Sequence, residues 1–348
     1  MSHPRDINDL WQNPAAPCFI IAEIAQAHDG SLGTAHAYID AVAATGADAV
    51  KFQTHIAAEE SSELDTWRVK FSKQDATRYD YWKRMEFTEP QWLELKQHAE
   101  EKGLVFLSSP FSLAAIRLLE RLGVPAWKVA SGEVTNRLFL DAMIATGKPV
   151  LVSSGMSYLE EMDATVALLK AAGSPVAVFQ CTTAYPCPPE KIGLNQIAEF
   201  MERYQCPVGL SDHSGTPYPS LAAVTLGAKL IEVHITFSRE MFGPDVSASL
   251  TTDEFKQMVA GVRSIETMQA SPLLKNASAE TMEPLRRMFG QSLVAATDLA
   301  AGTVITQQSL SCRKPGHGIA AANYTTVIGK KLRHAVKAAQ FLQLEDFE

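Results

Sequence analysis

The sequence of 348 residues lacks several features that mark specialised classes of protein. It has no run of about 18 apolar residues, so we expect no membrane-spanning helix. Its amino-terminal stretch is polar and contains proline, without the apolar segment of a secretory signal peptide. The five cysteines form an odd set with no C-x-x-C pair, which argues against a disulfide framework and favours a reducing cytoplasm.

Strong positive charge is also missing. The formal net charge is −8, and no block of like charge stands out. This balance argues against nucleic acid or an anionic membrane as the main partner. Hydrophobic residues make up 46% of the chain and charged residues 20%, as is usual for a globular protein with a substantial core. An anionic substrate would therefore need local lysines and backbone amides to bind it.

Eight short apolar runs, each suited to a β-strand, alternate with helix-like stretches. They begin at Cys18, Asp48, Leu104, Ala126, Pro149, Val176, Pro207 and Leu230. Near-continuous apolar strands alternating with helices predict a parallel sheet covered by helices, an α/β fold. Eight such units within about 250 residues predict a (β/α)8 TIM barrel, and a doubly wound open sheet is the competing topology. We favour the barrel because the count reaches eight.

The remaining segments predict how the chain is organised. We expect an amino-terminal extension over 1–17, the barrel over 18–270, a small-residue linker over 271–284 and a compact mixed α+β module over 285–348. Residues 55–88 form a long insertion after the second strand, rich in charge and aromatics. It predicts either a loop that covers the substrate or a solvated excursion that packs on the rim.

Polar residues gather at the carboxyl end of every predicted strand. In a barrel these ends meet at one rim, where the loops build the active site. An ordinary scaffold would place apolar or turn residues there instead. The polar residues predicted to lie at this rim include Glu23, Lys51, Ser109, Lys128, Ser131, Glu133, Ser153, Thr183, Ser211, His213, Glu232 and His234.

Two histidines stand at the ends of neighbouring strands. His213 follows the seventh strand and His234 ends the eighth, so we expect their imidazoles side by side. Two neutral imidazoles leave several coordination positions open, as a catalytic divalent metal requires, and they suit manganese, zinc, cobalt or iron. The alternative is a pair of structural core histidines. Asp245 could bind the metal or a substrate hydroxyl, or could serve only as a turn residue.

Two lysines end apolar strands, where burial is costly unless they meet an anion. Lys51 and Lys128 therefore predict a phosphate or carboxylate pocket, completed by hydroxyl groups. A Schiff-base lysine, or a lysine that reaches out to solvent, is the alternative reading of each. The hydroxyl groups expected in this pocket belong to Ser109, Ser131, Ser153 and Ser211.

Two acids accompany these lysines. Glu23 and Glu133 could position or deprotonate a water or hydroxyl, or could hold a lysine in a salt bridge, and spacing alone leaves both roles open. The cysteines are expected to fill the core. Cys181 lies near the rim, but nothing in the sequence pairs it with an activating base.

A series of motifs in register resembles the sialic acid synthase family. They are "FIIAEIAQAHDG", "GADAVKFQT", "FLSSPF", "KVASGE", "VSSGM", "CTTAYPCP", "VGLSDHS", "IEVHITF" and "GPDVSASL". The tail, with "KPGHGI" and "IGKKL", resembles the antifreeze-like SAF domain, a β-clip fold, that ends these synthases. The resemblance runs from about residue 18 to the carboxyl terminus. It implies a transferase that condenses phosphoenolpyruvate with an N-acylated mannosamine-type aldose, giving a nonulosonic acid and phosphate.

The resemblance also implies a role for each rim residue. His213 and His234 match the ligands of a divalent metal, usually Mn2+, with Mg2+ or Co2+ as alternatives. Glu23 and Glu133 match acids near the reacting carbons. The phosphoenolpyruvate positions are Lys51, Ser109, Lys128, Ser131, Ser153, Thr183 and Ser211, and the sugar-side positions are Tyr185, Asp245 and Lys314. The family's tail domain covers the active site of the partner subunit, which implies a domain-swapped homodimer.

Several positions depart from the family pattern. Lys314 stands where the family has an arginine, and lysine cannot reproduce the planar guanidinium fork. Other departures are Ala25 and Ala27 for glycine and asparagine, Thr183 for the asparagine of many bacterial members, and Val246 and Ser247 for a His-Lys pair. We therefore expect preserved chemistry and an unusual acceptor sugar, with N-acetylmannosamine, its 6-phosphate and diacetamido-trideoxy hexoses all open.

Three other functions were compared with this one. A related synthase would make a different 3-deoxy-2-ketoacid from an aldose phosphate, but the tail and the "GPD" motif argue against it. A Schiff-base aldolase on the same barrel would use Lys51 or Lys128 and resist chelators. A carbohydrate-binding protein with a decayed barrel would have lost a lysine, histidine or acid at the rim, and none is missing here.

Overall fold

A computed structural model describes residues 6–348. The chain forms two compact units, one ending at Ala270 and the other beginning at Ser271. Among the described residues, none of the helices combines the length and the apolar character that crossing a bilayer requires.

The first unit is built on eight parallel strands. They are β1 (Phe19–Ala25), β2 (Ala49–Thr54), β3 (Val105–Pro110), β4 (Trp127–Val129), β5 (Val150–Ser153), β6 (Val176–Cys181), β7 (Val208–Asp212) and β8 (Leu230–Thr236). Their hydrogen-bonded order is β3-β2-β1-β8-β7-β6-β5-β4. Because β1 pairs with both β2 and β8, the first and last strands are neighbours and the sheet curls into a nearly closed barrel. The predicted barrel is confirmed, and the doubly wound alternative is not.

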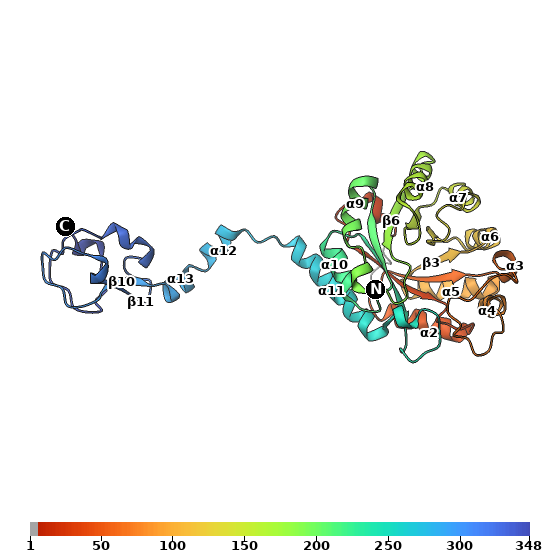
Figure 1. The fold of residues 1–348 in the computed structure, drawn as a ribbon, viewed down its shortest axis with the longest axis horizontal. Helices are drawn as coiled ribbons and strands as arrows, with labels where there is room; N and C mark the ends of the chain where they lie inside the picture. Colours follow the sequence, from red (N-terminus) through yellow and green to blue (C-terminus); the bar gives the residue numbers. More distant parts are fainter. Residues whose placement is uncertain (1–5) are drawn as a thin grey trace. The chain divides into compact units, whose positions relative to one another are not determined.

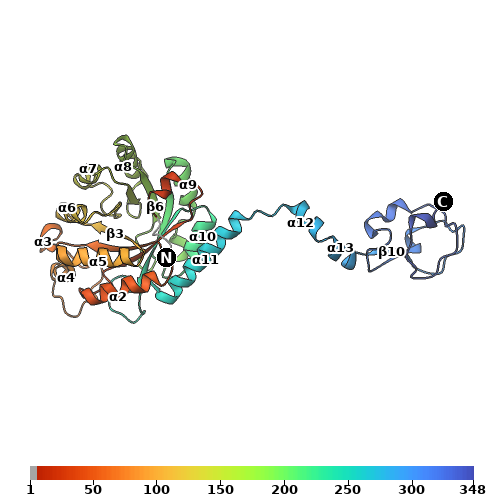
Figure 2. The same cartoon turned by 180° about the vertical axis from the view of Figure 1, so that it is seen from behind.

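Helices surround these strands, as the opposite views of Figures 1 and 2 show. The connecting helices are α2 (Leu32–Ala43), α5 (Glu89–Glu101), α6 (Leu113–Leu122), α7 (Arg137–Ile144), α8 (Leu159–Ala171), α9 (Asn195–Tyr204), α10 (Tyr218–Thr225) and α11 (Thr252–Ala270). Local signals set their ends. Ser112 caps the start of α6, and Gly123 ends it in the left-handed conformation that suits glycine. The insertion after β2 carries two further helices, α3 (Ala57–Glu60) and α4 (Arg78–Met85).

The interior of the barrel is layered because successive residues of a strand point to opposite faces. Its lower layer is apolar and includes Phe19, Ile21, Leu107, Leu151 and Phe179. Ile7 and Leu10, which flank the start of α1 (Asp9–Gln12), pack against this layer. Two residues further along the strands, the inward positions are polar. The apolar layer therefore forms the floor on which the polar rim rests.

The second unit has its own small apolar core. Strands β10 (Ser292–Ala295) and β11 (Leu310–Arg313) pair antiparallel, and helices α12 (Lys275–Thr281) and α13 (Glu283–Phe289) precede them. Leu293, Ile305, Val327, Leu332 and Leu342 are among the buried residues. The predicted small mixed module is thus present. The other short elements are β9 (Leu250–Thr251), which pairs with β8, and 3₁₀ segments at Pro189–Lys191, Val246–Ala248, Gln307–Ser309, Ala321–Thr326 and Leu344–Asp346.

Candidate active site

Two lysines and two glutamates form a buried charge network above the apolar floor. Lys51 Nζ lies 2.7 Å from Glu23 Oε2 and 3.8 Å from Glu232 Oε2. Lys128 Nζ lies 3.2 Å from Glu232 Oε1. All four side chains are nearly inaccessible, with at most 6% of their surface exposed. Buried charges must be paired, and here each lysine has a carboxylate partner before any substrate binds.

Three predicted hydroxyl groups complete this network. Lys51 Nζ donates to Ser109 Oγ at 3.1 Å, and Lys128 Nζ donates to Ser153 Oγ at 2.7 Å. Ser211 Oγ donates to Glu232 Oε1 at 3.0 Å. These contacts join residues from six strands, β2, β3, β4, β5, β7 and β8, so the barrel brings together side chains that are far apart in sequence.

The electrostatics of the network follow from burial and pairing. Burial, only partly offset by Lys51, raises the pKa of Glu23 above its ordinary value. Burial would also raise the pKa of Glu232, but Lys128 and Lys51 outweigh it and hold that pKa low. Likewise, burial opposes the charged form of Lys51, yet Glu23 and Glu232 raise its pKa overall. A Schiff-base role needs a neutral amine, so the raised pKa of Lys51 argues against that alternative.

His213 and His234 lie side by side, with their ring centroids 5.3 Å apart. Burial lowers the pKa of His213 to about 4, with His234 contributing, and burial lowers the pKa of His234 to about 3, with Lys51 contributing. Both imidazoles are therefore neutral near pH 7, as metal ligands must be. Nδ1 of His213 lies 2.9 Å from the carbonyl oxygen of Thr182, which leaves Nε2 available as a ligand.

The donor set around these histidines is small. Within residues 6–348, no three side chains of the His, Cys, Asp and Glu types come together as a ready-made metal cage. Two neutral, oriented imidazoles fit a divalent ion that takes its remaining ligands from water or substrate. The residues present therefore suit such a metal.

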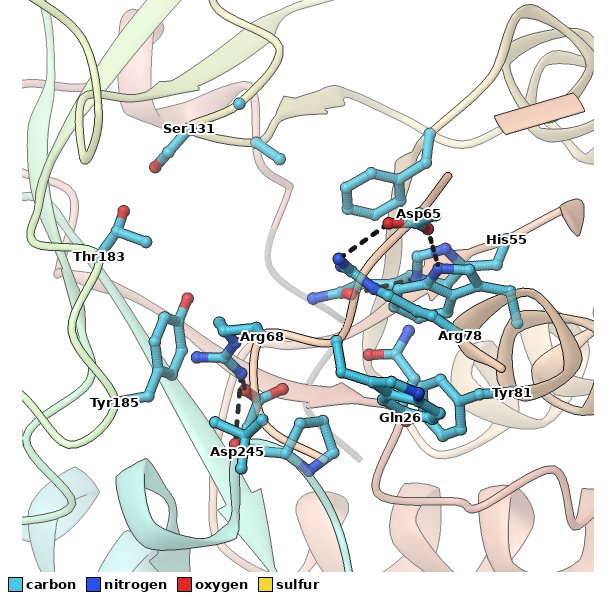
Figure 3. Close-up of a pocket in the computed structure, with 18 of the residues that line it drawn as sticks. Gln26, His55, Asp65, Arg68, Arg78, Tyr81, Ser131, Thr183, Tyr185 and Asp245 are labelled. Carbon is cyan, nitrogen blue, oxygen red and sulfur yellow. Dashed lines mark hydrogen bonds and ion pairs between the residues drawn. The ribbon is translucent and has the colours of Figure 1, made fainter. Parts of the chain in front are cut away.

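A cluster of Tyr185, Arg68 and Asp245 lies beside the two histidines. Figure 3 shows these three residues together. The ring of Tyr185 stacks on His213 at 4.1 Å and meets His234 edge-on at 5.9 Å. The guanidinium carbon of Arg68 lies 4.2 Å from the centre of the Tyr185 ring, and Arg68 Nη2 lies 2.6 Å from Asp245 Oδ1. Burial raises the pKa of Asp245, although Arg68 opposes the shift. Arg68 thus links two residues predicted to lie on the sugar side.

A cavity of about 380 Å³ opens at this rim. His234, Ser131, Glu133, Thr183, Tyr185 and Asp245 line it together with many residues of the 55–88 insertion. Among the latter are Asp65, Trp67, Arg68, Phe71, Arg78, Tyr81 and Trp82. The insertion therefore forms a wall of the cavity, as the covering-loop interpretation predicts.

The hydroxyl groups of Ser131 and Thr183 both lie close to Gly155. Gly155 N donates to Ser131 Oγ at 3.1 Å. A Cβ at Gly155 would lie 2.5 Å from Thr183 Oγ1, 2.6 Å from Ser131 Oγ and 2.9 Å from Cys181 Sγ, so a larger residue does not fit. Burial raises the pKa of Cys181, which keeps that thiol protonated and unreactive.

Two predicted residues lie apart from the charge network. Glu133 lies among the residues that line the cavity, where its Oε2 accepts a hydrogen bond from Asn136 Nδ2 at 2.7 Å. Lys314 belongs to the second unit, is exposed, and places Nζ 5.2 Å from the centre of the Phe289 ring. Its role toward a sugar stays a prediction.

Sequence reasoning gave no role to several members of the site. Glu232, predicted only as a polar residue at the rim, is the partner of both lysines and lies two residues before His234 on β8. Gln53 holds Glu23 through a 2.9 Å bond from Nε2 to Oε1. The side chain of Arg68 carried no local signal, and neither did the close approach of other groups to the backbone of Gly155, because these contacts are made only in the folded barrel.

One departure from the family pattern, Ala25, places a residue with a Cβ in an unfavourable backbone conformation. Ala25 ends β1 at a bulge and adopts a φ of 48°, in the left-handed region. Glycine adopts this conformation without the clash that a Cβ causes. The glycine expected from the resemblance therefore suits the position better than the alanine present.

Comparison with known proteins identifies the family. The model of the NeuB family matches residues 38–272, and the SAF domain model matches residues 290–348. The chain belongs to the NeuB family. The resemblance predicted from the motifs is confirmed, and with it the prediction of an acid-synthase enzyme.

Several relatives cover nearly the whole chain. N-acetylneuraminate-9-phosphate synthase of Homo sapiens is 34% identical over 92% of this chain and 90% of its own length. N,N'-diacetyllegionaminic acid synthase of Campylobacter jejuni is 32% identical over 89% of this chain and 94% of its own. The crystal structure of the N-acetylneuraminic acid synthetase of Leptospira borgpetersenii, in complex with citrate, matches with a TM-score of 0.69 and 29% identity over 78% of this chain and 94% of its own.

Proposed function

We propose that this NeuB-family enzyme condenses phosphoenolpyruvate with an amino-sugar aldose, giving a nonulosonic acid and phosphate. The observation that carries the proposal is the buried network of Lys51 and Lys128 beside two neutral imidazoles. It provides an anion site and a candidate metal site, and His234 of the metal site also lines the cavity. The named activities of the human and Campylobacter relatives, both acid synthases, support the same reaction class.

Phosphoenolpyruvate binds to the two lysines and their hydroxyl partners. Lys51 and Lys128 supply charge, while Ser109, Ser153 and Ser211 supply donors that fix the orientation of the anion. Ser131 and Thr183, which flank Gly155, extend the donor set toward the cavity. Glu23 and Glu232 hold the two lysine side chains in position before the anion arrives.

His213 and His234 hold a divalent metal that, when bound, polarises the aldehyde oxygen of the acceptor. Manganese and cobalt accept imidazole ligands more readily than magnesium, which prefers oxygen, so manganese is our first choice. Tyr185 packs against both rings and restricts their motion.

The chain's own residues guide the condensation. Carbon 3 of phosphoenolpyruvate bonds to the aldehyde carbon as the C2–C3 and aldehyde C=O double bonds are lost, and the aldehyde oxygen gains the proton that the attacking water gives up. That water adds at carbon 2, and the tetrahedral intermediate then breaks its C2–O bond to phosphate, which takes the hydroxyl proton as carbon 2 becomes a ketone. Glu23, held by Lys51 and Gln53, accepts a proton from the attacking water. The lysines stabilise the departing phosphate. Glu133 and Asp245, both on the cavity wall, bind sugar hydroxyls.

The second unit covers the site of a partner subunit in a domain-swapped homodimer, and Lys314 then reaches the sugar. The presence of an SAF domain after a barrel of this family supports the arrangement. The odd set of five cysteines, with no C-x-x-C pair, supports a cytoplasmic location.

Phosphate release tests the proposal. The full chain is incubated with phosphoenolpyruvate and a panel of N-acylated aldoses, with Mn2+ or with EDTA. We expect release that needs both an acceptor and the metal, and that falls at least about 100-fold in Lys128→Met because a transition-state contact to phosphate is lost. Lys102→Met, which removes a surface lysine paired with Asp40, is the matched control. Release without an acceptor, or full activity of Lys128→Met, would contradict the proposal.

A further inference from the structure

We infer that His55 is a positioning residue for the reaction and acts on Glu23 through Gln53. The inference rests on the proposed function, because it adds a residue that holds the proposed base of the same site. His55 follows β2 directly and begins the 55–88 insertion, so it stands where the cavity wall meets the barrel. It lies on the same side of the cavity as Asp65 and Arg78 (Figure 3).

A chain of hydrogen bonds joins the insertion to Glu23. Glu60 Oε1 lies 2.5 Å from Nδ1 of His55, and Nε2 of His55 lies 3.3 Å from Oε1 of Gln53. Gln53 Nε2 then donates to Glu23 Oε1 at 2.9 Å. The other carboxylate oxygen of Glu23, Oε2, lies 2.7 Å from Lys51 Nζ. Both oxygens of the proposed base are therefore oriented, one by a cation and the other by the chain that starts at Glu60.

The chemistry of the donors fixes the direction of this chain. As the proposed base, Glu23 is an ionised carboxylate that can only accept, so Gln53 must present its NH2 group to it. The amide oxygen of Gln53 then faces His55, whose Nε2 must carry the proton of that bond. Turning the amide over would bring its oxygen against the carboxylate of Glu23. The N–H group of His55 thus holds Gln53 in the orientation that serves Glu23.

Two aromatic rings fix the plane of the imidazole. Trp82 and Phe111 stack on His55 with centroid separations of 4.0 and 4.6 Å and interplanar angles of 14° and 10°. The side chains of His55 and Glu60 are almost fully buried, with 3% and 7% of their surface exposed. The contact of Glu60 with Nδ1 directs Nε2 toward Gln53. Gln53 therefore meets a donor at a constant position.

A purely structural histidine would hold the insertion in place without affecting the reacting groups of the folded enzyme. A positioning histidine changes kcat, because a displacement of about 1 Å can cost about 100-fold in rate. His55→Phe separates the two roles. The new ring can still stack with Trp82 and Phe111, but it has no N–H group for Gln53.

A double-mutant cycle in the full chain tests the inference. The kcat of phosphate release is measured with saturating phosphoenolpyruvate, acceptor and Mn2+ for the parent, His55→Phe, Gln53→Met and the double variant. We expect His55→Phe to lower kcat at least about tenfold and to leave KM for phosphoenolpyruvate within about threefold of the parent value. In the Gln53→Met background, the same change should lower kcat less than about twofold, because residues of one network do not act additively. His98→Phe, at a histidine paired with Asp40, is the matched control and should keep the parent kcat.

The outcomes separate the inference from the proposed function. A kcat of His55→Phe close to that of the parent, or effects of His55→Phe and Gln53→Met that multiply in the double variant, would overturn the inference and leave the proposed function intact. If the unpaired Glu60 prevents His55→Phe from folding, His55→Phe/Glu60→Leu takes its place with the same expected results, since replacing both partners of a buried pair is often nearly neutral. No phosphate release by the parent with any acceptor would refute the proposed function, and the inference with it.

Discussion

Replacing Lys51 by methionine separates the stability of the buried network from its function. In the native barrel, Lys51 pairs with Glu23 at 2.7 Å and donates to Ser109 at 3.1 Å, with both charged side chains almost fully buried. Methionine retains most of the side-chain volume but removes the cation. Glu23 then remains buried beside Glu232, with only Gln53 as a donor.

The cost follows from the unpaired charge. Breaking a buried ion pair by removing one partner costs about 3–5 kcal/mol, whereas replacing both partners with neutral residues is often nearly neutral. We therefore expect Lys51→Met to lower Tm by roughly 10 °C, since 1 kcal/mol corresponds to about 2–4 °C for a domain of this size class. The double variant Lys51→Met/Glu23→Gln should regain at least about 2 kcal/mol.

Urea unfolding and thermal scans at pH 8, together with phosphate release, measure both effects. Stability should recover in the double variant while activity stays absent, because the lysine is also needed to bind the anion. Equal stability of the single and double variants would refute the claim that Lys51 and Glu23 form a coupled buried pair. A single variant as stable as the parent would refute the burial argument itself.

Three further predictions concern histidine and backbone positions. His213→Ala should abolish metal-dependent phosphate release but leave the circular dichroism spectrum unchanged. If the variant, after metal removal and reconstitution, released phosphate at a rate close to that of the parent protein, the metal assignment would be contradicted. Ala25→Gly should raise the free energy of unfolding, measured in urea, by about 1 kcal/mol, because glycine adopts the φ of 48° without the clash of a Cβ. A lower free energy of unfolding in this variant would argue against backbone strain at Ala25. Burial lowers the pKa of His28 to about 3, and the charges of His55 and Arg84 contribute. The unfolded chain therefore binds a proton at this histidine more tightly than the folded chain does. The free energy of unfolding should fall as the pH drops from about 6.5 to 3, by up to about 1.4 kcal/mol per pH unit. His28→Gln should flatten that part of the profile of unfolding free energy against pH, and an unaltered slope would contradict the assignment.

The barrel and its polar rim could be predicted because they depend on periodic patterns. Apolar runs predict the strands, and the residues at their carboxyl ends must share one rim once the strands close into a barrel. The adjacency of His213 and His234 follows from this rule, and the ring separation of 5.3 Å agrees with it. The lysines and their serine partners could be grouped for the same reason.

The pairing of charges could not be predicted in the same way. Whether Lys51 meets Glu23, Glu133 or an anion depends on side-chain directions across several strands. The folded barrel pairs Lys51 with Glu23, whereas Glu133 accepts a hydrogen bond from Asn136. A covering loop could be predicted for the insertion, but the individual contacts that its side chains make could not. Arg68 reaches Asp245 across 177 positions of the chain, and no local pattern encodes a contact of that range.

The product of the reaction tests the central claim most directly. The full chain, supplied with Mn2+, phosphoenolpyruvate and the acceptor that supports the fastest phosphate release, should give one molecule of phosphate for each molecule of a new 2-keto acid. The mass of that acid should equal the acceptor plus the three-carbon unit of phosphoenolpyruvate, as read by mass spectrometry. Phosphate released together with free pyruvate, and no larger acid formed, would contradict the account, because the barrel would then hydrolyse phosphoenolpyruvate without forming a carbon–carbon bond.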